Sequence, residues 1–336
     1  MRTKTKKIRD TDYATATMRV RALERTLFTR ERAERFIDAR TDDEAAKVLV
    51  ECGYDEMSAF SAGELDGILA RARENLYEMI FSMVRDPAMA DIFRIRYDYH
   101  NAKVFVKSEA TGEDAAGLLV PAGRVPLKTL TDCFRSLSFD ALPKRLAGSV
   151  SDARELLART GDPQRADFHL DADCAREMSE LAASTGSAFL RDYVRLYIDA
   201  ANLRALVRAR RIGKGPDFLR FVLCPGGNVE LSRVSSMLVA GGEVTELYGG
   251  VLPEAAEAGR LAQSGDGSLT AFEKRCDDAL IREIRKTRYV PFGEQPVLAY
   301  LVAREAEMVM IRTIAAGRMG GVPAEQIRER MRESYA

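Results

Sequence analysis

Apolar residues recur at spacings of three and four along most of this chain, which is the period of a helix that buries one face. The stretch between residues 65 and 80 shows this best, with apolar positions at Leu65, Ile68, Leu69, Leu76, Met79 and Ile80. Clear strand-like alternation, and Asn-Gly or Asp-Gly hairpins between such strands, are missing. The pattern therefore predicts an all-α fold.

Three short motifs predict where helices begin. In "TDDE" (Thr41 to Glu44), "SAGE" (Ser61 to Glu64) and "TAFE" (Thr270 to Glu273) a hydroxyl stands three residues before a glutamate. In such a capping box the two side chains satisfy the first backbone N–H groups of a helix, which have no partner within it. We therefore expect a helix to start at each motif.

One long segment is repeated about one hundred residues later. "YDYHNAKVFVKSEATG" (Tyr97 to Gly112) aligns without a gap with "IDAANLRALVRARRIG" (Ile198 to Gly213), at an offset of 101 residues. The matched pairs include Asp98 with Asp199, Asn101 with Asn202, Lys103 with Arg204, and Gly112 with Gly213. A fainter third copy, "REAEMVMIRTIAAG" (Arg304 to Gly317), has Glu307 in the place of the asparagine.

A second motif repeats at nearly the same period, since "PAGRVPLKTL" (Pro121 to Leu130) matches "PGGNVELSRV" (Pro225 to Val234) at an offset of 104 residues. Two independent matches predict three similar helical lobes, assigned to residues 1–116, 117–216 and 217–336. Each lobe is expected to end in a long helix closed by a glycine suited to a C-cap. Because similar units tend to pack through similar faces, we infer a pseudo-threefold body.

Composition limits the possible partners. Hydrophobic residues at 46% and charged residues at 30% are typical of a soluble globular protein, and Lys plus Arg equals Asp plus Glu at 51 each, so no overall positive field attracts nucleic acid. The longest strictly apolar run, "VLAYLVA", is far shorter than the roughly 20 residues of a spanning helix. The five cysteines are widely spaced and are expected to be reduced thiols. The basic opening, Met1 to Asp10, is no secretory signal and is interpreted as a frayed or partner-ordered end.

Histidines and paired carboxylates are the first candidates for chemistry. His100 has Ala201 as its counterpart in the second copy, and no histidine lies near His169, so both are interpreted as structural or interfacial. Asp98 and Asn101 share one helix face, an arrangement that a packing contact would repeat but a catalytic pair would not. The acidic doublets at residues 42–43 and 277–278 match no magnesium or calcium motif and are interpreted as solvent-exposed.

Signatures of common enzyme classes are missing. No dinucleotide fingerprint, P-loop, GxSxG, HExxH or kinase motif occurs, and no cofactor or metal site is expected. The arginine-rich run "RALVRARR" (Arg204 to Arg211) lacks the interleaved aromatic residues of a single-stranded nucleic acid site. It is interpreted as the C-terminal end of a helix, where cations complement the helix dipole.

The whole pattern resembles the central-stalk component of rotary V-type and archaeal-type ATPases, called the C subunit in prokaryotic complexes and the d subunit in eukaryotic ones. The resemblance rests on "YATATMRVRALERTLFTRE" (Tyr13 to Glu31), "DYHNAK" (Asp98 to Lys103), "DAANLRAL" (Asp199 to Leu206) and the segment from Phe292 to Ser334. No single piece is a strict signature, but their order, spacing and repetition together are specific. The extension Met1 to Asp10 departs from the family pattern, and its role stays open.

The resemblance implies a funnel of three all-helical lobes that binds no nucleotide and catalyses no reaction. It also implies a peripheral position on the cytoplasmic face of the membrane, with one copy per complex. The implied partners are the proteolipid ring and the D and F subunits of the stalk, between which the protein would carry torque for proton or sodium transport. The runner-up hypothesis is an all-helical scaffold protein of another assembly, and an unrecognised all-α enzyme comes last.

Nine polar residues of the three repeated helices are the candidates for structural or interface roles. They are Asp98, Asn101, Lys103, Asp199, Asn202, Arg204, Glu305, Glu307 and Arg312. Five of them stand at matched positions, and we hypothesise that these either tie each terminal helix to its neighbours or line a central opening: Asp98, Asn101, Asp199, Asn202 and Glu307.

Overall fold

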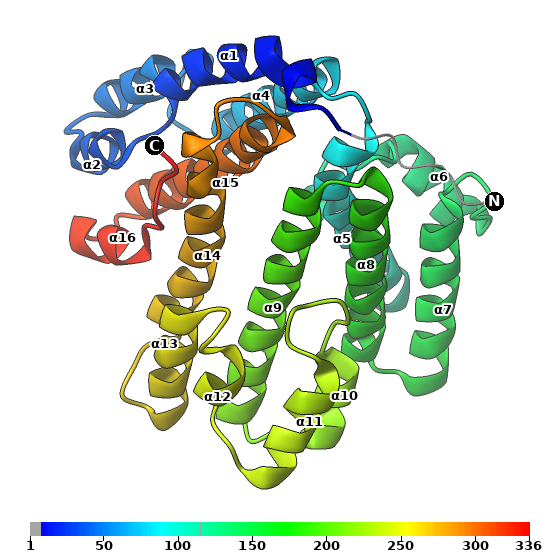
Figure 1. Cartoon of the computed structure of the whole chain (residues 1–336). Coiled ribbons are helices and arrows are strands. Elements are labelled where there is room, and N and C mark those ends of the chain that lie inside the picture. The colour runs from blue at the N-terminus through cyan, green and yellow to red at the C-terminus, as the bar shows by residue number, and fades with distance from the viewer. Residues whose placement is uncertain (1–7, 115) are drawn as a thin grey trace. The chain divides into compact units, whose positions relative to one another are not determined.

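The computed structural model describes residues 8–114 and 116–336, so Met1 to Lys7 of the basic opening lie outside the described residues. Every regular element of the described chain is a helix (Figure 1), which confirms the all-α prediction. The chain divides into two compact units, treated separately below. The central unit is Ala88–Ser264, and the terminal unit combines the described part of Lys6–Pro87 with Gly265–Ala336. The division into three lobes stays a prediction.

The central unit is built around three long helices, α5, α8 and α9. Its elements are α5 (Ala88–Thr111), η3 (Ala116–Leu118), α6 (Leu127–Ser136), α7 (Lys144–Thr160), α8 (Pro163–Thr185), α9 (Ala188–Arg211), α10 (Pro216–Val222), α11 (Leu231–Ala240), α12 (Val244–Tyr248) and α13 (Pro253–Ser264). Helix α8 packs against α5 and α7 as well as against α9 and α10. Ion pairs join α5 to α8, with Lys103 Nζ at 2.7 Å from Asp171 Oδ1 and Lys107 Nζ at 2.6 Å from Asp167 Oδ2.

The terminal unit brings together the two ends of the described chain around helix α15. Its elements are η1 (Asp10–Tyr13), α1 (Ala14–Leu23), η2 (Glu24–Thr26), α2 (Arg30–Asp38), α3 (Asp42–Glu51), α4 (Ala62–Met83), α14 (Leu269–Arg285), η4 (Lys286–Tyr289), α15 (Glu294–Met319) and α16 (Ala324–Arg330). Every residue from Pro296 to Glu305 is buried, because α15 packs against α1, α2, α4, α14 and α16. A helix that is apolar on all sides is buried on all sides.

The expected helix starts are confirmed at two of three sites, although the glutamates accept the N–H groups of Arg40 (Glu44) and of Ser58 and Ala59 (Glu64) rather than that of the N-cap residue. Thr41 and Ser61 are N-caps, and their hydroxyls accept the backbone N–H of Glu44 and Glu64. At the third site the prediction is wrong, because α14 begins earlier than the motif implied and the hydroxyl of Ser268 accepts the N–H of Ala271. A serine placed just ahead of the helix takes the role that the motif assigned to Thr270.

Glycine follows the end of all three long repeated helices. Gly112 and Gly213 follow α5 and α9 with φ angles of 72° and 69°, the left-handed conformation expected of a C-cap glycine. The third helix ends later than its copy of the repeat, because Gly317 lies inside α15, whose C-cap is Gly320, followed by Gly321 with a φ angle of 64°. A Cβ at Gly317 would lie 2.9 Å from the side chain of Ile327, so this glycine lets α16 approach α15 closely.

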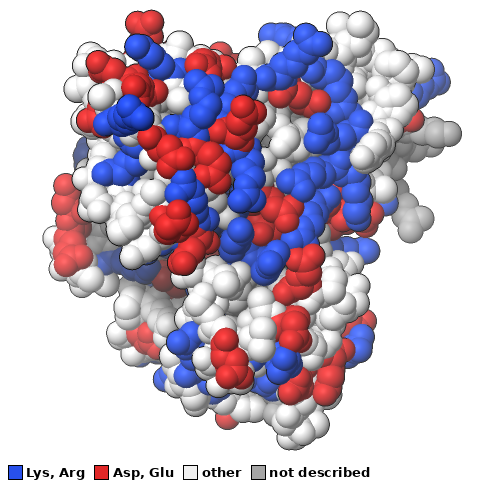
Figure 2. All heavy atoms as spheres, turned by 90° about the vertical axis from the view of Figure 1, so that its left-hand side faces the viewer, with Lys and Arg blue, Asp and Glu red and all other residues white. Residues whose placement is uncertain are grey.

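The described surface mixes charges of both signs. Figure 2 shows Lys and Arg side chains interspersed with Asp and Glu over the visible face. This mixing agrees with the equal numbers of basic and acidic residues in the sequence. No helix of the described residues is both long and apolar enough to cross a bilayer.

Candidate functional site

A pair of polar side chains in the middle of α5 holds the loop that leads to α6. Asp98 is fully buried, and its Oδ1 accepts the backbone N–H of Val125 at 3.0 Å while its Oδ2 accepts Arg124 Nε at 2.7 Å. Asn101 exchanges two hydrogen bonds of 2.9 Å with the backbone N–H and C=O of Val120. We call such a set of bonds from a long helix to the loop ahead of a following helix a loop clamp.

The second repeat builds the same loop clamp from α9. Asp199 Oδ1 accepts the backbone N–H of Val229 at 3.1 Å, and its Oδ2 accepts the backbone and side-chain N–H groups of Asn228 at 2.9 and 2.8 Å. Asn202 exchanges bonds of 2.8 and 2.7 Å with the backbone of Cys224. The held valines, Val125 and Val229, each lie two residues before the start of their helix, α6 or α11. The two sequence motifs that repeat at slightly different offsets are therefore the two halves of one structure.

A glycine in each loop makes this close approach possible. A Cβ added at Gly123 would lie 2.2 Å from Asp98 Oδ1, and one added at Gly227 would lie 2.2 Å from Asp199 Oδ1. No side chain fits in either position without moving the buried carboxylate. The glycine of "PAGRV" and of "PGGNV" is thus explained by the aspartate on the preceding long helix.

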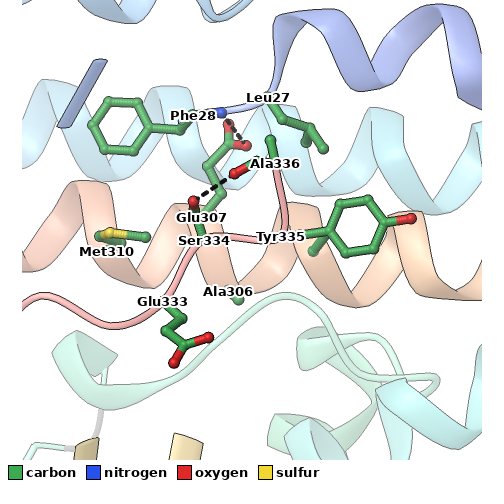
Figure 3. Close-up of a pocket in the computed structure, with 10 residues that line it drawn as sticks. Leu27, Phe28, Ala306, Glu307, Met310, Glu333, Ser334, Tyr335 and Ala336 are labelled. Atoms are coloured by element: carbon green, nitrogen blue, oxygen red, sulfur yellow. Dashed lines mark hydrogen bonds between the residues drawn. The ribbon is translucent and has the colours of Figure 1, made fainter. Parts of the chain in front are cut away.

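In the third copy a long helix again holds the backbone ahead of another helix, but it does so with different side chains. Glu307 of α15 is buried, and its Oε2 accepts the backbone N–H of Phe28 at 2.8 Å, one residue before the N-cap of α2 (Figure 3). Its Oε1 accepts Tyr54 Oη at 2.8 Å and Arg304 Nη1 at 2.5 Å. The Arg304 guanidinium also lies 4.6 Å from the centre of the Tyr54 ring and donates to the carbonyl of Cys52 at 3.3 Å. A carboxylate has no N–H to give, so Arg304 supplies the donor that asparagine supplies in the other two copies.

Burial dominates the electrostatics of these carboxyl groups. Burial raises the pKa of Asp98, although the N–H of Val125 and the guanidinium of Arg124 act in the opposite direction. Burial likewise raises the pKa of Glu307 against the opposing effects of Arg304 and the N–H of Phe28. Every bond to these groups therefore offsets a large desolvation cost.

The other candidate residues lie elsewhere. Lys103 pairs with Asp171, and Glu305 is buried and accepts Tyr77 Oη at 2.7 Å, which joins α15 to α4. Arg312 is exposed and donates to Asp66 with Nε at 2.9 Å. Arg204 is half-buried and lines a cavity between α8, α9 and α10. The structure thus places Asp98 with Asn101 and Asp199 with Asn202 in two equivalent clamps and Glu307 in a related third arrangement, and it does not bring the remaining candidates to any of them.

The two histidines occupy unlike settings. His100 is exposed, and its Nε2 lies 3.0 Å from the carbonyl oxygen of Leu118. His169 Nε2 lies 3.4 Å from a carboxylate oxygen of Asp173 and 3.8 Å from one of Asp152. Among the described residues no group of three or more His, Cys, Asp or Glu side chains is arranged to hold a metal ion.

The role of the C-terminal segment, residues 331–336, was not predicted from the sequence. Tyr335 is buried and donates its hydroxyl to Glu24 Oε1 at 2.9 Å. Arg282 and Arg285 both bind the carboxylate of Glu333, at 2.7 and 2.8 Å. The segment runs past Glu307 and, with Phe28 and Met310, encloses a cavity of about 10 Å³, the space of one water molecule (Figure 3).

The interpretation of the second acidic doublet as solvent-exposed is wrong. Asp278 has no exposed surface, and its Oδ1 accepts the backbone N–H of Glu333 at 2.6 Å. Asp277, its neighbour, is partly exposed and pairs with Arg332 at 2.5 Å. Asp278 lies three residues before Ile281, which is buried on the same face of α14, so a sequence signal existed. The first doublet, Asp42 and Asp43, is exposed at the start of α3 as expected.

Comparison with known proteins gives one consistent result. Residues 16–330 match the family described as ATP synthase (C/AC39) subunit. The C subunit of the V-type sodium ATPase of Enterococcus hirae is 23% identical over 326 residues, covering 94% of this chain and 97% of that protein. The C subunit of the A-type ATP synthase of Desulfurococcus sp. is 25% identical, covering 95% of this chain and 90% of that protein.

The C subunit of the V-type ATP synthase of Thermus thermophilus is also 25% identical, covering 95% of this chain and 98% of that protein. These relatives match the chain along nearly all of its length, and so does the family as a whole. The resemblance inferred from the repeated segments is therefore confirmed, and the chain belongs to the ATP synthase (C/AC39) subunit family.

Proposed function

We propose that this protein is a non-catalytic adapter in the rotor of a V/A-type rotary ATPase. In this role it sits as a single peripheral copy on the cytoplasmic face of the membrane proteolipid ring. It receives the foot of the stalk formed by the D and F subunits, and it passes torque between ATP chemistry and the movement of protons or sodium ions. The names of its relatives, which belong to a sodium ATPase and to ATP synthases, support this proposal.

The repeated loop clamp is the observation that carries the proposal. An adapter under torque must keep its long helices from sliding against the segments that connect them. Each clamp fixes the middle of a long helix to the backbone of a loop, through Asp98 and Asn101 in the first copy and Asp199 and Asn202 in the second. Charge-assisted and buried hydrogen bonds of this kind resist displacement, since breaking them leaves polar groups without partners.

The chain order of the clamps supports three equivalent lobes. Helix α5 holds the loop before α6, and α9 holds the loop before α11, so each clamp joins the end of one proposed lobe to the beginning of the next. Helix α15 holds Phe28, just before α2, and so joins the end of the third proposed lobe to the beginning of the first. We propose on this basis that residues 1–116, 117–216 and 217–336 form three lobes of equivalent construction.

Reconstitution of the complex with and without this protein tests the proposal. Vesicles are loaded with the complete ATPase or with the ATPase lacking this chain, and ATP hydrolysis and ion uptake are measured together. The complete complex should couple the two, whereas the complex lacking the chain should hydrolyse ATP without ion uptake, or fail to join ring and stalk. Coupled transport in its absence would contradict the adapter role.

A further inference from the structure

A cavity of about 510 Å³ lies in the central unit, between α8, α9 and α10. Asn202 and Cys224, which form the second loop clamp, lie in its wall. Voids larger than a water molecule are few in protein cores, whereas binding sites for small molecules typically have volumes of ~300–1,000 Å³ and mostly apolar linings. The size of this cavity is therefore that of a ligand site.

The internal repeat explains where this space comes from. Ala201 and Ala205 stand where the first copy of the repeat has His100 and Val104, at the same offset of 101 residues. With Ala209 these alanines form a row along α9, four residues apart, and all of them line the cavity. Two positions that are large in one copy are thus small in the other, and space is left beside them.

Aromatic rings from all three helices line the cavity. Phe168 of α8 and Phe218 of α10 lie edge to face, with their ring centres 5.5 Å apart. Tyr197 of α9 adds another ring to the wall. Aromatic rings favour offset or edge-to-face contacts with other rings, and such contacts contribute beyond the area that they bury. This part of the wall therefore favours a ligand that is itself aromatic.

Sulfur-containing side chains form another part of the wall. Cys174 and Met178 line the cavity from α8, with Cys174 Sγ 4.0 Å from Met178 Sδ, and Cys224 lines it from the segment after α10. Burial raises the pKa of the Cys224 thiol to about 12 and also raises that of Cys174, so both are neutral S–H groups near pH 7. Polarizable sulfur atoms make favourable contacts with the edges of aromatic rings. The sulfur wall thus favours the same class of ligand as the aromatic wall.

The charged residues that the structure describes along the cavity wall are already engaged within the protein. The carboxylate of Asp171 lies 2.7 Å from the ammonium group of Lys103. Arg204 and Arg208 of α9 likewise make interactions with other parts of the chain. An ionised ligand would lose its hydration in this mostly apolar site, which is costly without an available partner of opposite charge. The cavity therefore favours an uncharged ligand.

We propose that this cavity binds an uncharged aromatic molecule of two or three rings. A cavity of ~150 Å³ with an apolar lining can hold one benzene molecule, so this cavity has room for about three such rings. The ligand's rings lie against Phe168, Phe218 and Tyr197, and their edges contact the sulfur atoms of Cys174 and Met178. This binding site goes beyond the adapter role proposed above and does not depend on it.

Fluorescence titration of the full-length protein with phenylnaphthylamine tests the class of ligand, because this uncharged aromatic probe becomes brighter in apolar surroundings. Anilinonaphthalene sulfonate has the same ring skeleton with one added sulfonate, so it is the matched charged control. We expect saturable 1:1 binding of the uncharged probe and at least tenfold weaker binding of the sulfonate. Equal affinity for the two probes, or absence of saturable binding, would overturn the proposal.

Competition distinguishes an aromatic ligand from an apolar ligand of any kind. Naphthalene and decalin share one carbon skeleton, but only naphthalene is aromatic. Naphthalene should displace the bound probe with at least fivefold higher affinity than decalin, because only its rings make the expected contacts with the aromatic and sulfur walls. Equal displacement by the two hydrocarbons would overturn the assignment of an aromatic ligand.

Substitutions locate the binding site. Ala205→Phe should fill part of the cavity and weaken binding of phenylnaphthylamine at least tenfold, whereas Ala183→Phe, at an exposed position of α8, should change it less than twofold. Circular dichroism melting shows whether each variant is folded, and Ala201→Phe is the substitute where Ala205→Phe does not fold. Equal effects of the cavity variant and the exposed variant would overturn the location.

Alkylation of the unchanged protein locates the ligand without any substitution. Bound phenylnaphthylamine should slow the reaction of Cys174 with N-ethylmaleimide at least fivefold, because this thiol lines the cavity. Cys133 of α6 does not line it and is the control, whose reaction rate should stay the same. Peptide mass spectrometry follows both sites, and an unchanged rate at Cys174 would contradict binding in this cavity.

Discussion

The carboxylate of Asp98 accepts a hydrogen bond of 3.0 Å from the backbone N–H of Val125, a residue 27 positions further along the chain. The same bond, at 3.1 Å, joins Asp199 to Val229 in the second copy of the repeat. Both aspartates are fully buried, so each holds its loop from within the core rather than at the surface. These two equivalent contacts explain why the aspartate recurs in both copies of the repeated segment.

Replacing the clamp asparagines should destabilise the protein. Asn101→Leu removes both bonds to the N–H and C=O of the half-buried Val120, and Asn202→Leu removes both bonds to the buried Cys224. Each change should cost ~2–4 kcal/mol of unfolding free energy, measured by urea denaturation. Asn75→Leu, at an exposed position of α4, is the matched control and should change stability by less than ~0.5 kcal/mol.

The double variant, Asn101→Leu with Asn202→Leu, should also weaken coupling in the reconstituted complex. Unchanged melting together with unchanged stalk binding would contradict the structural role of these residues.

A methyl group at the clamp glycines should be costly. Gly123→Ala and Gly227→Ala each place a Cβ at about 2.2 Å from the buried carboxylate, so the loop or the aspartate must move. We expect a loss of ~1–3 kcal/mol at each position, as for other overpacked sites. Gly148→Ala, within α7 and with no atom near the added Cβ, should instead stabilise by up to ~1 kcal/mol. Equal effects at all three glycines would count against a close-contact explanation.

The Arg304 and Glu307 pair should show strong energetic coupling. Glu307→Leu leaves the guanidinium of Arg304 buried without its carboxylate and removes the acceptor of the Phe28 N–H and the Tyr54 hydroxyl. A loss of ~3–5 kcal/mol is expected. Arg304→Leu alone should cost a similar amount, and the double variant should cost less than the sum by at least ~1 kcal/mol. Additive effects in this double-mutant cycle would show that the pair does not act as a unit.

The anchor of the C-terminal segment should weaken in acid. Burial raises the pKa of Glu333, but the bonds from Arg282 and Arg285 outweigh it and hold the pKa below its usual value. The ionised form is therefore favoured by folding, and its stabilising contribution is present above pH 4.5 and is lost as the pH falls through the lowered pKa. Glu333→Gln should cost ~1–2 kcal/mol at pH 7, and the difference from the unchanged protein should shrink toward pH 3.

Glu329→Gln, an exposed carboxylate of α16, is the control and should show no such pH-dependent difference. A difference for Glu333→Gln that is the same at pH 7 and pH 3 would show that its charge does not stabilise the segment.

Local signals predicted local structure well. The three- and four-residue period predicted helices, because a buried helix face must repeat its apolar positions along the chain. The N-caps at Thr41 and Ser61 were confirmed because the hydroxyl and the N–H that it accepts lie within one helical turn. The same logic was wrong at Thr270, where a competing serine two residues earlier satisfies the helix start.

The sequence by itself determined the helical class, the family and the equivalence of Asp98 with Asp199 and of Asn101 with Asn202, since each is written in spacing and identity. Only the tertiary structure decided what these residues bind, because the partner of a buried polar group is a backbone that arrives from a distant part of the chain. The burial of Asp278 under the C-terminal segment and the cavity between α8, α9 and α10 were also decided by the tertiary structure. Both depend on which surfaces pack together in the folded chain, and the local spacing of apolar and polar residues does not predict this.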